Sequence, residues 1–149
     1  MKKIIFSFLC LSMLLACNFD SNKARAREQA ESEHSHSAVL SLNNGTKWKA
    51  DAVTNHNVIR LKNTADMFRI KPFPSASTYQ LLGSDLANDA DTMIQQCTMK
   101  GPDHEALHKW LEPILDQTNQ LKNITDTAAA RNIFEAVDKR IDEYYQYFE

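Results

Sequence analysis

The sequence predicts an all-α protein whose folded part is an antiparallel up-down four-helix bundle. The 149 residues include only three glycines and four prolines, a composition that favours helices over a turn-rich β-sandwich. After residue 50, apolar residues recur at spacings of three and four in four long segments, the pattern of helices with one buried face. The connections between the segments are short, so neighbouring helices are expected to be antiparallel.

The first two predicted helices span about residues 50 to 70 and 78 to 99. Lys71-Pro72-Phe73-Pro74 separates them, and Ser75 or Ser77 can cap the start of the second. Gly101 then ends the second helix, and Pro102 fits the first turn of the next one. The expected core residues are Thr54, Val58, Leu61, Ala65 and Phe68 in the first helix, and Tyr79, Leu82, Leu86, Ala90, Met93 and Cys97 in the second.

The third predicted helix starts at this turn, and the fourth starts after Thr125 or Asp126. Pro113 lies inside the third helix, where a proline is expected to produce a kink. A domain of residues 42 to 149 is long enough to bury one core without disulfide bonds. The expected core residues are His104, Leu107, Leu111, Ile114, Thr118 and Leu121 in the third helix, and Ala130, Phe134, Val137, Ile141, Tyr144 and Phe148 in the fourth.

Residues 1 to 16 have the features of a signal peptide. Lys2 and Lys3 precede an apolar run that is too short to span a bilayer comfortably. The run ends in Leu14-Leu15-Ala16-Cys17, which resembles a bacterial lipobox. The resemblance implies cleavage after Ala16 and attachment of acyl chains such as palmitate to Cys17, in the bacterial cell envelope. The alternative is an ordinary signal peptide with an incidental cysteine.

Residues 17 to 41 are expected to form a disordered tether after the lipidated cysteine, because they are polar and have no apolar face. Asn18 follows the lipidation site. By similarity to enterobacterial sorting, that residue favours the outer membrane over the inner one. Without the signal, the chain has 15 basic and 19 acidic residues, which predicts no nucleic-acid partner.

Nucleotide-binding loops are excluded by the positions of the glycines. Gly45, Gly83 and Gly101 are too far apart for a dinucleotide fingerprint or a P-loop. Of the three cysteines, Cys10 leaves with the signal and Cys17 carries lipid, so Cys97 is the only free thiol expected in the mature protein. It is a candidate for a bridge between two copies, an inert buried thiol, a reactive thiol or a metal ligand.

Four residues around the Gly101 turn form the candidate site. Met93 and Cys97 are four residues apart, as are His104 and His108, so each pair shares a helix face. At about 1.5 Å per residue, Cys97 and His104 lie ~6 and ~4.5 Å from the turn, nearly level with each other. The pattern predicts a transition-metal site made by these four side chains.

The ligand types favour copper(I), because thiolate and thioether are soft ligands. Zinc is the second candidate, with Cys97, both histidines and a water or carboxylate as ligands. Non-covalent haem is a weaker alternative, because the Cys-x-x-Cys-His attachment motif is absent. A purely structural interpretation also stands: Met93 and Cys97 are ordinary core fillers, and His104 and His108 are polar helix residues.

One resemblance covers about residues 42 to 122. Cys97-Thr98-Met99-Lys100-Gly101 with His104 and His108, together with the segment Leu42-Asn43-Asn44-Gly45-Thr46-Lys47-Trp48-Lys49, resembles small uncharacterised envelope proteins of the Bacteroidota. The resemblance implies a shared helical domain and no particular activity.

Three functions follow from these observations. The first is a lipid-anchored, non-enzymatic protein that binds a transition metal at Met93, Cys97, His104 and His108. The second is a non-catalytic helical module that contacts an envelope protein partner and binds no metal. The third is a thiol enzyme with Cys97 as nucleophile and His104 as base, and it is the weakest because no third orienting group is evident.

Overall fold

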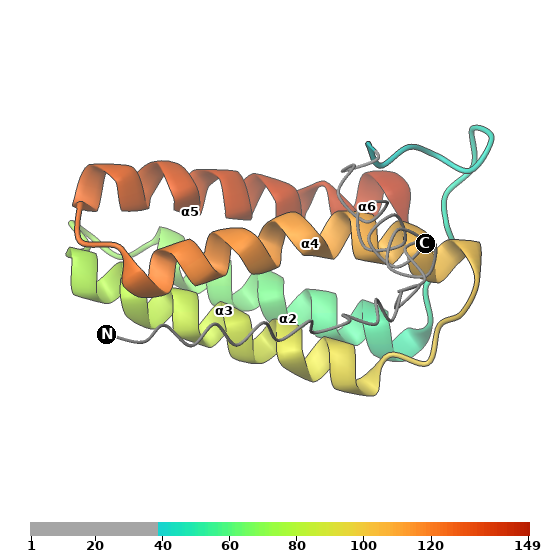
Figure 1. Cartoon of the computed structure of the whole chain (residues 1–149), viewed down its shortest axis with the longest axis horizontal. Helices are drawn as coiled ribbons and strands as arrows, with labels where there is room; N and C mark the ends of the chain where they lie inside the picture. Colours follow the sequence, from blue (N-terminus) through green and yellow to red (C-terminus); the bar gives the residue numbers. More distant parts are fainter. Residues whose placement is uncertain (1–38) are drawn as a thin grey trace, which may run out of the picture. The chain divides into compact units, whose positions relative to one another are not determined.

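The computed structural model describes residues 39–149, and this part of the chain is all-helical (Figure 1). The predicted signal peptide, the lipidated Cys17 and nearly all of the predicted tether lie outside the described residues. Figure 1 shows the long helices side by side, as in a helical bundle, and the C-terminus lies beside the segment that precedes α2. The helices are α2 (Ala52–Arg69), α3 (Ala76–Gln96), α4 (Pro102–Asn123), α5 (Thr127–Asp142) and the short α6 (Tyr144–Tyr147).

Side chains cap three of the long helices at their first turns. Asp51 accepts a hydrogen bond from the Thr54 N–H at 2.7 Å at the start of α2. Ser75, one of the two predicted caps, accepts from the Thr78 N–H at 3.3 Å. Asp126 accepts from the Ala128 N–H at 2.8 Å at the start of α5. These oxygens satisfy N–H groups that have no partner within the helix.

Helix α3 ends three residues earlier than its sequence pattern predicts. Cys97 has extended backbone, with φ −62° and ψ 127°, and Gly101 has a positive φ of 67°. Thr98 explains the early end, because its N–H and hydroxyl donate to the Asp51 carboxylate at 3.2 and 2.6 Å. This contact with the start of α2 draws residues 97 to 100 out of the helix.

The fourth predicted helix is divided at Glu143 into α5 and α6. Phe148 then leaves the helix and forms a β-bridge with Trp48. The Trp48 N–H donates to the Tyr147 oxygen at 2.8 Å, and the Glu149 N–H donates to the Trp48 oxygen at 3.0 Å. The helix therefore ends where the C-terminus pairs with the segment that precedes α2.

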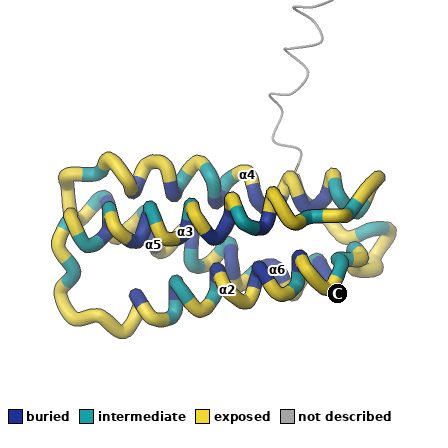
Figure 2. The backbone as a smooth tube through the Cα atoms, turned by 90° about the horizontal axis from the view of Figure 1, so that it is seen from below, coloured by how far each residue is buried: buried dark blue, intermediate teal, exposed yellow. Residues whose placement is uncertain are grey.

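The core lies between the inward faces of the long helices, which Figure 2 shows in dark blue. The residues expected in the core are buried, with two exceptions: Cys97 and His104 are only partly buried. Trp110 and Leu40 also belong to the core. The spacing of apolar residues by three and four positions thus predicted nearly all of the residues that form the buried face of each helix. Across residues 39–149, no helix has both the length and the apolar character needed to traverse a bilayer.

Gly83 sets the close approach of α3 to α4. A Cβ atom at this position would lie 2.8 Å from the Leu121 Cβ atom, 2.8 Å from the Lys122 nitrogen and 2.9 Å from the Thr118 oxygen. These distances are shorter than any ordinary van der Waals contact, and two of the three atoms belong to the α4 backbone. Only glycine fits here, and the two helices that carry the candidate site pack tightly as a result.

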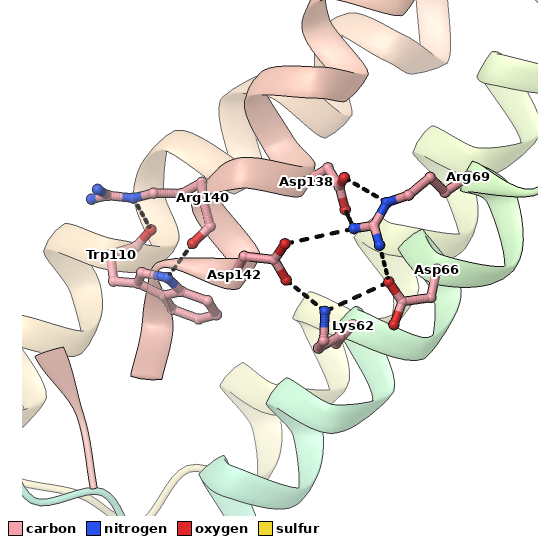
Figure 3. Close-up of polar contacts among 7 residues, drawn as sticks. All are labelled: Lys62, Asp66, Arg69, Trp110, Asp138, Arg140 and Asp142. Carbon is pink, nitrogen blue, oxygen red and sulfur yellow. Dashed lines mark hydrogen bonds and ion pairs between the residues drawn. The ribbon is translucent and has the colours of Figure 1, made fainter. Parts of the chain in front are cut away.

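Ion pairs connect α2 to α5 on the outer surface (Figure 3). Lys62 lies 2.5 Å from Asp142, and the Arg69 guanidinium is paired with Asp138 through two of its nitrogens. Asp66 contacts both cations from within α2. Surface pairs of this kind contribute little singly, but a connected group also fixes how the two helices are aligned.

A second polar contact in Figure 3 joins α4 to α5. The Trp110 indole N–H donates to the Arg140 oxygen at 2.8 Å, and the Arg140 Nε donates back to the Trp110 oxygen at 3.2 Å. Another Arg140 nitrogen donates to the Lys109 oxygen at 2.7 Å. Helix α4 continues through Pro113 as a single helix, and these bonds lie one turn before that proline.

Candidate functional site

The four residues predicted to form the site all line one small cavity between α3 and α4. Met93 and Cys97 come from the end of α3, and His104 and His108 come from the first two turns of α4. The cavity has a volume of about 100 Å³. Its remaining walls are mostly apolar and consist of Ile94, Leu107, Leu111, Glu112 and Leu115.

The two sulfur residues differ in their surroundings. Met93 is fully buried within the core stripe of α3. Cys97 is partly buried, and the hydroxyl of the fully buried Thr54 donates to its sulfur at 3.9 Å. Thr54 belongs to α2, so a third helix contacts the candidate site. The sequence pattern placed Thr54 in the core but carried no signal for its contact with Cys97.

The two imidazole rings of the site contact each other directly. The Nε2 atoms of His104 and His108 are 3.0 Å apart, and the rings meet edge to face with centroids 4.5 Å apart. Two nitrogens that bind one metal ion at ~2.0 to 2.1 Å each lie roughly 2.9 to 3.4 Å apart, for bond angles from a right angle to tetrahedral. As it stands, the 3.0 Å separation is a hydrogen bond in which one ring donates to the other. The same separation falls within the range for two nitrogens on one cation, which would require that neither Nε2 atom carries a proton.

Glu112 is a fifth potential ligand on the wall of the cavity, and the sequence reasoning missed it. It follows His108 by four residues, just as His108 follows His104, so the three lie along one face of α4. This repeated spacing was visible in the sequence. A carboxylate in this position can supply the oxygen ligand that zinc would take beside imidazoles.

The polar side chains do not converge as closely as the sequence argument expected. Within residues 39–149, no three side chains of His, Cys, Asp or Glu gather into a group that could hold a metal ion. Met99 packs against the core and is not part of the cavity wall. The histidine pair and the two sulfur residues therefore share a cavity, and common ligation would need side-chain rotation.

Asp51 holds the segment that carries Cys97. Burial acts to raise its pKa, but hydrogen bonds from the Thr98 hydroxyl and the Thr54 N–H outweigh burial and lower the pKa to about 2. The carboxylate is therefore charged at neutral pH and keeps both threonines in place. Nearby, the Tyr144 hydroxyl donates to the Asn55 side-chain oxygen at 2.9 Å, and burial raises the pKa of that tyrosine.

Asp103, one of the two acidic neighbours of His104 in the sequence, has another partner. Asp103 accepts a hydrogen bond from the Lys49 N–H at 2.9 Å, so this carboxylate ties the segment before α2 to the start of α4. Among the hydrogen bonds of residues 39–149, His104 has His108 as its partner and Asp103 has Lys49.

No protein-family model, curated protein or solved structure matches this sequence.

Proposed function

We propose that this protein is a lipid-anchored, non-enzymatic component of the bacterial cell envelope that binds a transition metal ion. The proposed ligands are Met93, Cys97, His104 and His108. One observation carries the proposal: these side chains line a single small cavity in which the two imidazole Nε2 atoms lie 3.0 Å apart.

Copper(I) fits this set of ligands best. A thioether and a thiolate are soft ligands, and methionine is not a usual ligand of zinc. Leu107 and Leu111 form a buried apolar wall, which suits an ion of low charge, and His108 lies on the exposed side of the cavity. Zinc is the second choice and would use Cys97 and the histidine pair, with Glu112 or a water completing its ligands.

The architecture proposed for the domain is an antiparallel up-down bundle. Contacts between α2 and α3 support it. As the residue number increases along α2, the residue number of the contacting partner in α3 decreases, as it does in antiparallel helices. Thr54 meets Cys97, and Arg60 and Thr64 meet Asp89.

The anchor follows from the Leu14-Leu15-Ala16-Cys17 motif. Acyl chains on Cys17 would hold the domain at a membrane, with the outer membrane favoured over the inner one. A protein partner in the envelope is compatible with this location, whereas nucleic acids and nucleotides are not proposed as ligands.

A non-catalytic interaction module without metal is the second candidate. The observation that favours it is the absence, within residues 39–149, of a group of three His, Cys, Asp or Glu side chains placed around a common point. Haem is disfavoured, because a cavity of about 100 Å³ is smaller than the roughly 300 to 1,000 Å³ of pockets that enclose drug-sized ligands.

Competition with a chromophoric copper(I) chelator, without oxygen, tests the metal proposal. The protein would start at residue 17 and carry Cys17→Ser, so that Cys97 is its only thiol. We expect one copper(I) ion per chain and an affinity that falls about tenfold or more in Cys97→Ser, Met93→Leu and His104→Ala.

Matched controls use the remaining histidines. His56→Ala removes an exposed imidazole of α2 outside the cavity, and His34→Ala with His36→Ala removes the histidines before the domain. None of these should change the affinity. Sub-stoichiometric copper that is the same in the wild type and in all site variants would remove the metal proposal and leave the interaction module.

A further inference from the structure

A second and larger hollow lies on the outer side of α2 and α3, away from the candidate metal site. Its volume is about 380 Å³. Met67 and Leu81 form its rim, and 70% and 67% of their respective surfaces are exposed. Phe68 and Leu82 lie beneath them in the core. Met67 and Leu81 thus line one hollow from two different helices, and both are largely exposed to water. Apolar side chains gathered around one hollow are candidates for an interaction surface.

Opposite charges border this groove. Lys71 lines it just after the end of α2, with its ammonium 5.6 Å from the centroid of the Phe68 ring. Asp85 lines it in α3. Among residues 39–149, neither side chain forms an ion pair. Asp89, in contrast, is held by Arg60 at 2.8 Å and Thr64 at 2.6 Å.

The two free charges lie at opposite ends of the groove. Lys71 comes four residues after Met67, and Asp85 comes four residues after Leu81. The short connection between Arg69 and Ala76 places Lys71 at the end where the two helices are joined, and α3 leads away from it. Asp85 is about one helical turn, ~5 to 6 Å, beyond Leu81 in α3. Lys71 follows the end of α2, so the two charges lie on opposite sides of the apolar middle.

A surface with a positive end, an apolar middle and a negative end is complementary to itself after a twofold rotation. We propose that this face binds a second copy of the same chain in a symmetric dimer. Met67 and Leu81 pack against the same residues of the other copy, and Lys71 of each chain pairs with Asp85 of the partner subunit.

The charge pattern favours a second copy over a lipid surface. An anionic membrane would attract Lys71 but repel Asp85, which borders the same groove. In the symmetric dimer, each of these charges gains an opposite charge, and the exposed apolar rim leaves water. The proposal does not depend on metal binding or on the lipid anchor.

Charge exchange provides the test. The chain from residue 17 with Cys17→Ser would be studied by sedimentation equilibrium in a reducing buffer, which prevents any bridge through Cys97. We expect a concentration-dependent dimer for the parent chain. Lys71→Asp and Asp85→Lys should each raise the dissociation constant tenfold or more, because each places like charges opposite one another.

The double variant Lys71→Asp with Asp85→Lys should restore the dimer, because it re-forms both pairs with their signs exchanged. Met67→Glu should abolish the dimer. Ile59→Glu is the matched control, since Ile59 is an exposed apolar residue of α2 that does not line the groove. Circular dichroism and thermal unfolding confirm that each variant is folded.

Three results would overturn the proposal. One is a monomer at every concentration up to the millimolar range. Another is a dimer that is unaffected by the single charge reversals or is not restored by the exchange. The third is a monomer that binds vesicles of phosphatidylethanolamine and phosphatidylglycerol through Met67 and Leu81, which would make the face a lipid contact instead.

Discussion

The guanidinium of Arg140 in α5 donates a hydrogen bond to the backbone oxygen of Lys109 in α4, 2.7 Å away. Lys109 precedes Pro113 by four residues, so its oxygen is the one that an N–H at position 113 would normally bind. Arg140 supplies the missing donor from a neighbouring helix. Helix α4 can therefore contain a proline without leaving this carbonyl unsatisfied.

The first prediction concerns this contact. Arg140→Ala should lower the free energy of unfolding by about 1.5 to 3 kcal/mol, the usual range for hydrogen bonds from a charged group. Urea denaturation measures the change. In a Pro113→Ala background the residue at position 113 regains its N–H, so the same arginine substitution should cost clearly less. Equal costs in both backgrounds would show that Arg140 does not substitute for the absent N–H.

The second prediction concerns Gly83. Alanine is a better helix former than glycine by ~1 kcal/mol, yet Gly83→Ala should destabilise the protein by about 1 to 3 kcal/mol, because its Cβ would press against the α4 backbone. Thermal unfolding measures the effect. Gln95→Ala, at an exposed position of the same helix, should be nearly neutral. An increase in melting temperature for Gly83→Ala would mean that α3 and α4 can separate freely.

The third prediction follows from Asp51, whose pKa is lowered from 3.8 to about 2. A carboxyl with a lower pKa in the folded state stabilises the protein above the pKa of the unfolded state. That contribution is lost as the pH falls from about 4 towards 2. Urea denaturation at a series of pH values should show this loss in the wild type. In Asp51→Asn, stability should be lower at pH 7 and should fall less between pH 4 and pH 2.

The fourth prediction concerns the reactivity of Cys97. Its sulfur is partly buried, which limits access of the reagent, so alkylation by iodoacetamide at neutral pH should be slow. Copper(I) should slow it further in the wild type but much less in His104→Ala, if imidazole and thiolate bind the same ion. Rapid alkylation without metal would instead favour the thiol-enzyme hypothesis.

The helices could be predicted from the sequence because buried residues recur every three or four positions within each helix. Leu61, Leu86 and Ile141 stand at spacings that any one helix reveals by itself, and each is fully buried. The end of α3 could not be found in this way, because it depends on a hydrogen bond between Asp51 and Thr98, which lie 47 residues apart.

The candidate site was predictable to a similar extent. The four-residue spacing before Gly101 and the one after it predicted that the four residues would lie close together, and all four line one cavity. The position of Thr54 beside Cys97 required the packing of α2, which no local pattern contains. Glu112 could have been predicted in part. Its four-residue spacing from His108 is visible in the sequence, but nothing in the sequence shows that this face of α4 lines the cavity.

The pairing of Trp48 with the last residues of the chain has a mechanical consequence. A pull on the chain ahead of residue 39 first meets Leu40, which is buried in the core, and then Trp48. There the load passes to hydrogen bonds with the Tyr147 oxygen and the Glu149 nitrogen. A force applied from the N-terminal side therefore loads the C-terminus of the chain before it reaches the first turn of α2.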